Sequence, residues 1–384
     1  MLHAYVVFYE RTINVASYVM RGKQRLEPSS IPVDKGNLSE NTASQPSGSQ
    51  SSSSPPTKPH TTAVIYTTKK TSPSLSSRLS SSRLSPVQRS SSLPHTNKPQ
   101  MLEKCRLDPK DFRGQINISM KAPSIAEMEQ KFDKLKPGGH NIPQGCRADR
   151  MAIIVPFRDR DEHLRIMLNN LHPFLMKQKL DYAIIVVEQV RDQTFNRAKL
   201  LNVGFVEAAK MYKWECYLFH DVDLLPENDR NLHKCPAKNP RHMAVAMDKF
   251  GYKLAYENMF GTSSALTDEQ FREVNGFSNR YWGWGGEDDD MFTRIKEAGY
   301  LIDRYNTSIA RYKMIRHGRD DGNEVNPCRF KLLSHTKKDW QKDGLNTLAY
   351  RIVNITVKKL YTHIMVDLVE SKEKPAVHRH FCAR

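Results

Sequence analysis

The chain has 384 residues, enough for one large domain or two ordinary ones, and it is basic, with 59 Lys and Arg against 42 Asp and Glu. The basic residues form no stripe interleaved with aromatic residues, and zinc-finger, helix-turn-helix and RNA-motif signatures are lacking, so we expect no nucleic-acid partner. A basic surface also suits an anionic small substrate.

The N-terminal segment, residues 1–24, is not a convincing membrane anchor. Its best apolar run, Ala4–Tyr9, ends at Glu10 and Arg11. A transmembrane helix needs about 20 apolar residues, and a signal peptide needs a clean apolar core of about 7–15. We therefore expect that the anchor is absent or incomplete in this segment.

Residues 25–100 are predicted to be a disordered stem. Residues 41–100 contain no Asp or Glu and are dense in Ser, Thr and Pro. Such a segment cannot bury enough apolar surface to fold alone. Residues 101–384 are predicted to form the globular domain.

The cysteines and glycosylation sequons favour the lumen of the secretory pathway. None of the six cysteines forms a CxxC pair, so metal binding by thiolates is not expected. Four sequons begin at Asn37, Asn117, Asn306 and Asn354. Sequons arise often by chance, and it is their occurrence together with the stem and the cysteines that favours the lumen. The cysteines are Cys105, Cys146, Cys216, Cys235, Cys328 and Cys382.

Strands and helices are predicted to alternate along the globular part. Short apolar runs at Met151–Val155, Ala183–Val187 and Cys216–Phe219 are typical of buried strands. Apolar residues at helical spacing occupy His163–Lys179 and Phe195–Tyr212. This alternation predicts an α/β fold with a Rossmann-like, mostly parallel central sheet and helices on both faces.

Each of the three predicted strands ends in polar residues. Ligands of open α/β sheets bind beyond the carboxyl ends of the strands. We therefore expect one crevice to collect Arg158, Arg160, Glu188, Arg197, Asp221 and Asp223.

Asp221 and Asp223 are the first candidate metal ligands. They flank Val222 at a strand end, so the two carboxylates face the same way. Hard divalent cations prefer carboxylate oxygens and often bridge them to substrate phosphates. His317 is a further possible ligand, although a single His is more often structural, and Met314 alone would be a core residue.

The sequence YWGWGGEDDDMF, residues 281–292, indicates a carbohydrate site. Glycines at 283, 285 and 286 free the backbone around Trp284, whose ring could stack on a sugar. One carboxylate among Glu287–Asp290 could act as a general base. The alternative is that these acids cap a helix beginning near Met291.

Several ordered motifs together resemble the β-1,4-galactosyltransferase family. They are VPFRDRDEHL, FNRAKLLNVGF, HDVDLLP, AMDKFGY, NGFSNRYWGWGGEDDD, MIRHGRD and DGLNTLAY, spread over Met151–Tyr350, and the resemblance reaches back to Cys105. It does not cover residues 1–100 or the extreme C-terminus. The resemblance implies a GT-A type glycosyltransferase fold and an inverting, metal-dependent Golgi enzyme.

The resemblance also assigns roles to residues. Asp288 would be the catalytic base, with Glu287 and Asp289 holding sugar hydroxyls. The manganese ligands would be Asp223, Met314 and His317. The UDP-sugar donor would be held by Pro156, Phe157, Arg158, Arg160, Phe195, Arg197, Asp221, Lys249 and the mobile Trp284. The acceptor site and its specificity would involve Phe250, Tyr256, Met259, Gly285, Gly286, Arg329, Phe330 and Leu333. Disulfides would join Cys105 to Cys146 and Cys216 to Cys235, with Cys328 either free or paired with Cys382.

The expected reaction transfers galactose from UDP-galactose to the 4-hydroxyl of a terminal β-N-acetylglucosamine on glycoproteins or glycolipids, with Mn²⁺. Met259 stands where vertebrate members carry a tyrosine that crowds the sugar C2 position, so UDP-GalNAc is an alternative donor. Thr262 replaces a glycine beside that pocket and could narrow it, which would offset the extra room left by Met259. An alternative of another class is a non-catalytic carbohydrate-binding protein. The expected location is the Golgi lumen, with membrane attachment only through an N-terminal type II anchor.

Overall fold

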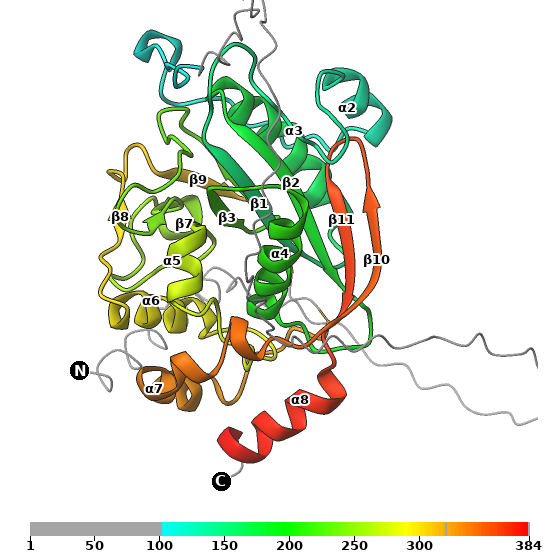
Figure 1. Ribbon diagram of the computed structural model, residues 1–384, viewed down its shortest axis with the longest axis vertical. Coiled ribbons are helices and arrows are strands. Elements are labelled where there is room, and N and C mark those ends of the chain that lie inside the picture. Colours follow the sequence, from blue (N-terminus) through cyan, green and yellow to red (C-terminus); the bar gives the residue numbers. More distant parts are fainter. Residues whose placement is uncertain (1–101, 319–320, 383–384) are drawn as a thin grey trace, which may run out of the picture. The chain divides into compact units, whose positions relative to one another are not determined.

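The computed structural model describes residues 102–318 and 321–382. Its centre is a sheet of eight strands in the order β10-β11-β2-β1-β3-β7-β5-β8 (Figure 1). The predicted strands are confirmed as β1 (Arg150–Phe157), β2 (Asp181–Gln189) and β3 (Cys216–His220), and they are parallel. The predicted N-terminal segment and stem lie outside the described residues.

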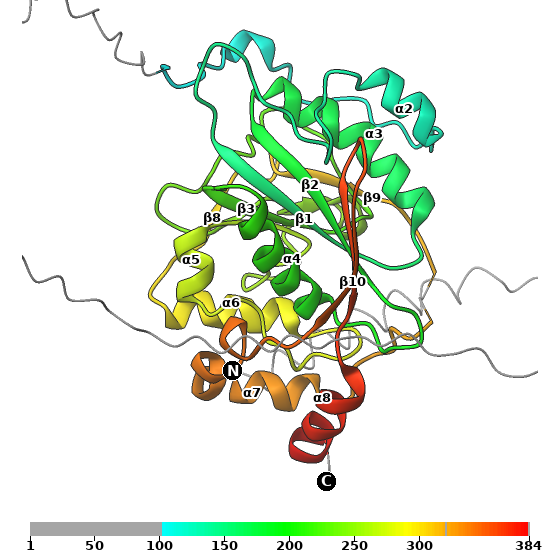
Figure 2. The same cartoon turned by 45° about the vertical axis from the view of Figure 1, so that its right-hand side comes forward.

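Two helices cover opposite faces of these parallel strands, as predicted (Figures 1 and 2). Helix α3 (Asp161–Lys177) shares an apolar core with Ile153 of β1, and α4 (Arg197–Met211) shares a second core with the next residue, Ile154. Successive residues of a strand point to opposite faces, so the continuous apolar run of β1 serves both cores.

The remaining strands make the sheet mixed. On the β3 side lie β7 (Ser263–Thr267), β5 (Arg241–His242) and β8 (Asp303–Arg304), with β7 antiparallel to β3. On the β2 side, β11 (Thr362–Asp367) runs parallel to β2, and β10 (Arg351–Val357) forms an exposed antiparallel edge. A second sheet has the order β4-β9-β6 and consists of β4 (Leu224–Pro226), β9 (Arg311–Met314) and β6 (Ala246–Met247).

The other helices surround these two sheets. The α-helices are α2 (Ile125–Lys131), α5 (Asp268–Glu273), α6 (Glu287–Glu297), α7 (Arg329–Asp339) and α8 (Glu370–Val377). Short 3₁₀ turns are η1 (Pro109–Asp111), η2 (Asp248–Phe250), η3 (Trp340–Lys342) and η4 (Leu345–Thr347), and η5 (His378–Cys382) is a π-helical turn. Figures 1 and 2 both place α7 and α8 at the same end of the domain.

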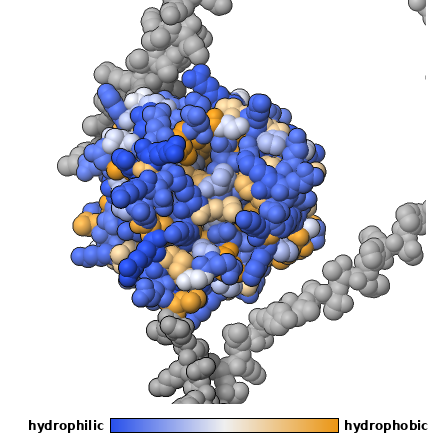
Figure 3. Space-filling view, turned by 90° about the horizontal axis from the view of Figure 1, so that it is seen from above, coloured by the Kyte–Doolittle hydropathy of each residue, from blue (hydrophilic) through white to orange (hydrophobic). Residues whose placement is uncertain are grey.

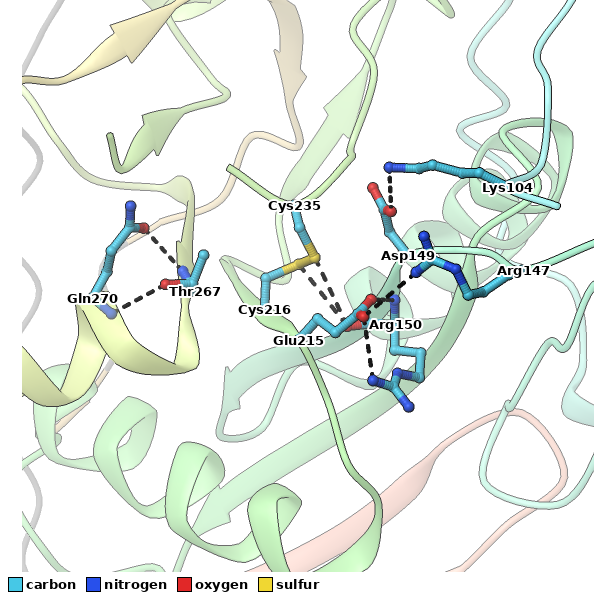
Figure 4. The surroundings of a disulfide bond; sticks show 9 residues. All are labelled: Lys104, Arg147, Asp149, Arg150, Glu215, Cys216, Cys235, Thr267 and Gln270. Atoms are coloured by element: carbon cyan, nitrogen blue, oxygen red, sulfur yellow. Dashed lines mark hydrogen bonds and ion pairs between the residues drawn. A yellow bond between two sulfur atoms is a disulfide. The ribbon is translucent and has the colours of Figure 1, made fainter. Parts of the chain in front are cut away.

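All six cysteines are paired. The structure confirms the disulfides Cys105–Cys146 and Cys216–Cys235, and it resolves the open alternative for Cys328, which pairs with Cys382. Figure 4 shows the second of these bonds at the start of β3, beside the carbonyl of Arg150 on β1. The carboxylate of Glu215 accepts a hydrogen bond from the backbone N–H of Arg150, which ties the two strand starts together.

Within residues 102–318 and 321–382, no helix combines the length and the apolar character that crossing a membrane requires. On the face seen in Figure 3, hydrophilic residues dominate and apolar residues lie scattered among them.

Candidate active site

The acidic run begins helix α6 rather than preceding it. The prediction of a helix beginning near Met291 is wrong: α6 begins at Glu287, directly after Gly286, whose φ of 96° is left-handed. The four acids therefore form the first helical turn, where the helix dipole favours negative charge. A helical turn points neighbouring side chains in different directions, so the four carboxylates have separate environments.

Arg197, the first residue of α4, joins three carboxylates from different elements. Its Nε lies 2.6 Å from Oδ1 of Asp221, and its Nη1 lies 2.8 Å from Oδ1 of Asp288 and 3.6 Å from Oε1 of Glu287. Asp221 follows β3, whereas the other two acids belong to α6. The parallel strand ends and the α6 turn therefore meet at one guanidinium, as the crevice hypothesis requires for Arg197 and Asp221.

Burial strongly affects this carboxylate cluster. It raises the pKa of Asp221 to about 7 and that of Asp288 to about 6, although the charge of Arg197 opposes both changes. Burial, followed by the charge of Asp288, raises the pKa of Asp289 to about 6, while a hydrogen bond with Tyr256 opposes the rise. Burial also raises the pKa of Glu287, whose Oε2 lacks a hydrogen-bond partner within the described part of the chain. Proton acceptors that titrate near neutral pH are suited to acid–base chemistry.

The lack of a side chain at Gly261 leaves room for the carboxylate of Asp288. A Cβ atom at this glycine would lie 1.8 Å from Oδ2 of Asp288, closer than any packing allows. The next residue, Thr262, has a φ of 64°, which is unusual for a β-branched side chain, and its carbonyl accepts a hydrogen bond from the N–H of Asp221. Sequence reasoning missed Gly261, because nothing local to FGTSS indicates that α6 approaches it.

The three predicted metal ligands lie beside one another. Oδ2 of Asp223 is 3.2 Å from Nε2 of His317, and the backbone carbonyl of Asp223 accepts a hydrogen bond from Ile315. Met314, the last residue of β9, pairs with Leu224 in the second sheet. A carboxylate and an imidazole this close can share a divalent cation, and the thioether is a softer, less usual partner for a hard ion.

Polar groups surround this pair. Nη2 of Arg160 lies 2.8 Å from Nδ1 of His317, and the ring of His163 is 5.6 Å from that imidazole between centroids. The hydrogen bond with Asp223 raises the pKa of His317, whereas burial lowers that of His163. Among the described residues, no group of three or more His, Cys, Asp or Glu side chains is arranged to hold a metal ion.

The predicted donor residues Arg158 and Phe195 form a second group near the strand ends. The guanidinium of Arg158 lies over the Phe195 ring, 4.9 Å from its centroid, and donates to the carbonyls of Gln193 and Asp321. The backbone N–H of Phe195 donates to the carbonyl of Gly322, and its carbonyl accepts a hydrogen bond from the N–H of Gly283. Pro156 and Phe157 are buried at the end of β1. Lys249 is exposed in η2, and its ammonium lies 5.8 Å from the ring centroid of Phe250.

Trp284 lies between this group and helix α7. The residue is 42% exposed, and its backbone bonds to Glu324 and Asn326 just before α7. Arg329 lies so close to Gly285 that a Cβ there would be 3.1 Å from its Cδ, and the corresponding distance from Gly286 to the Arg329 Cβ is 3.2 Å.

The other predicted acceptor residues come from different elements and lie at differing depths. Phe330 and Phe250 are exposed. Leu333 of α7 packs against a small apolar cluster that includes Tyr281 and Leu332. Met259 is buried in the α3-side core, to which Tyr256 also packs.

Glu188 does not join the crevice. Its Oε2 lies 2.6 Å from Nε2 of His363 on β11, which pairs with β2 on the side away from β1. The prediction failed because the C-terminal strand was not expected to enter the sheet. The polar end of β2 therefore serves a structural contact between strands.

Comparison with known proteins identifies families and individual enzymes to which the chain is similar. A family described as "N-terminal region of glycosyl transferase group 7" matches residues 105–236, and one described as "N-terminal domain of galactosyltransferase" matches residues 241–318. Human beta-1,4-galactosyltransferase 3 is 50% identical over 272 residues, covering 70% of this chain and 69% of that protein. Human beta-1,4-galactosyltransferase 1 is 47% identical over 278 residues, with coverage of 72% and 69%.

Solved structures of beta-1,4-galactosyltransferases are also similar to this chain. The catalytic domain of Drosophila beta-1,4-galactosyltransferase 7 in complex with xylobiose is 32% identical and superposes with a TM-score of 0.52, covering 60% of this chain and 99% of that chain. A mutant of the same enzyme, in complex with manganese, UDP-Gal and xylobiose, matches equally well. The predicted GT-A type glycosyltransferase fold is thereby confirmed. The chain belongs to the β-1,4-galactosyltransferase family of glycosyltransferases.

Proposed function

We propose that this enzyme transfers galactose from UDP-galactose to the 4-hydroxyl of a terminal β-N-acetylglucosamine, with inversion at the anomeric carbon. The observation that carries the proposal is the carboxylate cluster around Arg197, which lies beside the Asp223–His317 pair. A relative that binds manganese, UDP-Gal and a disaccharide supports the same assignment of substrates. The acceptor would be a glycan on a glycoprotein or glycolipid.

Asp288 is the proposed base. It would accept the proton of the acceptor hydroxyl while that oxygen attacks the donor sugar on the face opposite to UDP. The pKa of about 6 leaves it ionised at neutral pH, and its contact with Arg197 fixes the carboxylate in one orientation. The unpartnered Oε2 of Glu287 and the Asp289–Tyr256 pair would receive sugar hydroxyls.

The donor would bind between the strand ends and the segment after β9. Phe195 and Arg158 form a flat surface suited to the uracil ring, and Arg160 adds positive charge beside His317 for the diphosphate. Asp223, His317 and Met314 would hold Mn²⁺, which offsets the negative charge on the departing UDP. Trp284 would cover the sugar with its exposed ring.

The identity of the donor sugar is a separate proposal, because Met259 favours UDP-GalNAc as an alternative to UDP-galactose. Methionine is flexible where vertebrate members carry a rigid tyrosine, so UDP-GalNAc is a second proposed donor. The position of this residue in the same buried core to which Met314 and Tyr256 pack is consistent with a role in shaping the pocket.

The test is a parallel donor assay on the full chain. UDP-galactose, UDP-GalNAc and UDP-glucose are each supplied with Mn²⁺ and a β-linked N-acetylglucosamine acceptor. We expect turnover of UDP-galactose, lost on chelation of the metal and in Asp288→Asn. Binding of donor and acceptor without release of UDP would instead identify a carbohydrate-binding protein. UDP-GalNAc turnover below about a hundredth of that of UDP-galactose, roughly 2.7 kcal/mol in barrier, rejects the second donor.

We also propose that the enzyme works in the Golgi lumen, attached through an N-terminal type II anchor. The three disulfides support an oxidising compartment. Immunofluorescence of the tagged full chain with a Golgi marker, together with protease protection of the C-terminus in sealed vesicles, tests this location.

A further inference from the structure

Strand β10 (Arg351–Val357) forms an exposed edge of the central sheet (Figure 1). It pairs with β11 on one side, and among the strands that the structure describes it has no partner on the other side. All seven residues of β10 are exposed, and Val353 and Val357 are 55% and 60% exposed. An edge of this kind offers unpaired backbone groups to any extended chain, so soluble proteins usually protect it.

The amino-acid sequence of this edge provides little protection. Residues 352–357 read IVNITV, five of them β-branched, without a charged residue, glycine or proline. Six-residue segments with high β-propensity and low charge are prone to bind one another as strands. A bulge lies between Ile352 and Asn354, but the nearest charged residues along the chain, Arg351 and Lys358, flank the stretch. The stretch is therefore open to strand pairing unless something else covers it.

The sequon that begins at Asn354 lies within this stretch. Asn354 and Thr356 are both exposed and are two positions apart, so their side chains lie on the same face of β10. Nδ2 of Asn354 donates to Oγ1 of Thr356 at 3.0 Å, which is a contact within the sequon itself. Asn354 pairs with Met365 of β11, whereas the next residue, Ile355, pairs with the buried Ile364. The asparagine amide therefore lies on the face opposite to Ile364, and a sugar attached to it would extend into solvent.

This position differs from those of the other sequons in the described part of the chain. Asn117 and Asn306 are also exposed, but neither belongs to a strand, so a sugar on either would leave the sheet edges unchanged. Strands pair at a separation of about 4.8 Å, and a bulky, hydrated oligosaccharide midway along β10 would keep a second strand from approaching so closely. Among the described sequons, it is Asn354 at which glycosylation would protect an edge.

We propose that Asn354 carries an N-linked oligosaccharide, which shields the edge strand β10 from pairing with other chains. The inference rests on the proposed lumenal location but does not require the proposed transfer reaction. In the modification, Nδ2 of Asn354 forms a bond to the anomeric carbon of the first N-acetylglucosamine of a lipid-linked oligosaccharide diphosphate. The bond from that carbon to the diphosphate oxygen breaks, the lipid diphosphate leaves, and Nδ2 gives up one proton.

The modification is tested on the full chain, tagged at its C-terminus and produced in eukaryotic cells. Treatment with peptide-N-glycosidase should increase the gel mobility of wild type by one step more than that of Asn354→Gln or Thr356→Ala, since both variants lack the sequon. Thr356→Ser keeps the sequon and is the matched control, so it should behave as wild type. Mass spectrometry of the peptide that contains Asn354 should show the glycan directly.

Two outcomes overturn the modification, and they differ in what else they imply. Chain that is protected from protease inside sealed vesicles but carries an unmodified Asn354 refutes the glycan and leaves the lumenal location standing. Chain that lies outside the vesicles refutes both the glycan and the location. Neither result bears on galactose transfer, which is measured separately on the same protein.

The shielding role is tested by sedimentation of the purified proteins. Asn354→Gln and Thr356→Ala should self-associate at a protein concentration roughly tenfold below that for wild type and Thr356→Ser, because the edge is uncovered. Adding Val357→Lys to Asn354→Gln should reverse this change, since a lysine on an edge strand opposes pairing. Unchanged association in Asn354→Gln, or association that Val357→Lys does not relieve, refutes the shielding. Galactose transfer should be unchanged in these variants, because no proposed site residue lies on β10, and its loss would assign the sugar to the active site instead.

Discussion

Replacing Asp288 by Asn should abolish sugar transfer and at the same time make the domain more stable. The carboxylate is surrounded by protein, with 25% of its side chain exposed, and burial raises its pKa from 3.8 to about 6. A difference of about 2 in pKa, at about 1.4 kcal/mol for each pH unit, corresponds to about 3 kcal/mol. Partial solvent screening makes this an upper value. Asparagine has the same shape and keeps an oxygen for Arg197, but it carries no charge.

The direction of the effect depends on pH. Because the folded-state pKa is raised, the ionised carboxylate lowers stability progressively as pH rises from about 4 to about 6, and the full loss is present at pH 7.5. The asparagine variant should therefore melt several degrees, at most roughly 5–10 °C, above wild type at pH 7.5. The difference should shrink towards zero near pH 4, where the wild-type carboxyl is protonated.

Asp290 is the matched control for this prediction, because it belongs to the same helical turn. Its Oδ1 is 2.5 Å from Arg294, and Thr336 and Tyr281 bond to its other oxygen. Asp290→Asn breaks a buried pair and should lower stability by about 3 kcal/mol. Thermal unfolding by circular dichroism at pH 7.5 and pH 4, without metal or donor, measures both variants, and transfer is assayed with UDP-galactose. If Asp288→Asn melts below wild type at pH 7.5, the burial argument is wrong.

Three further changes test neighbouring parts of the site. Thr262→Gly relieves a β-branched residue at φ 64° and should raise the melting temperature by a few degrees, about 1 kcal/mol, whereas a lower value would show that this backbone is unstrained. Met259→Tyr should reduce UDP-GalNAc turnover at least tenfold relative to UDP-galactose, and an unchanged donor ratio in the paired assay would remove Met259 from the specificity pocket. The transfer rate should fall tenfold per pH unit below about pH 6, as the proposed base at position 288 is protonated, and a pH–rate profile that stays flat to pH 4.5 would exclude it.

The parallel centre of the fold could be predicted because its signal is local. The apolar runs of β1, β2 and β3 and the helical spacing of α3 and α4 each lie within one segment, and the structure confirms them. The short strands β5, β7 and β8 could not be found in this way. Two to five residues carry too little periodicity to identify a strand, and their pairing is decided by distant partners.

The part of the site that follows the ends of the parallel strands could be predicted from the sequence. Asp221, Asp223 and Arg197 follow from the rule that ligands bind at the carboxyl edge of such sheets. The run Asp288–Asp290 shows the limit of sequence-based prediction, because two identical residues only two positions apart have different roles. One contacts Arg197 in the crevice, and Asp290 pairs with Arg294 inside the domain. Only tertiary packing separates them. The role of Met314 came from family resemblance alone, and the resemblance also favoured His317 as a ligand over a structural role.

The insertion of β11 next to β2 also affects how the protein is made. The contact between Glu188 and His363 joins residues 175 positions apart, so most of this edge of β2 stays unpaired until β11 has left the ribosome. Such distant pairings slow folding, and an unpaired strand edge can bind other chains in the meantime. Nascent chains interrupted before β11 would present this edge to chaperones, so the central sheet can close only after β11 has been synthesised.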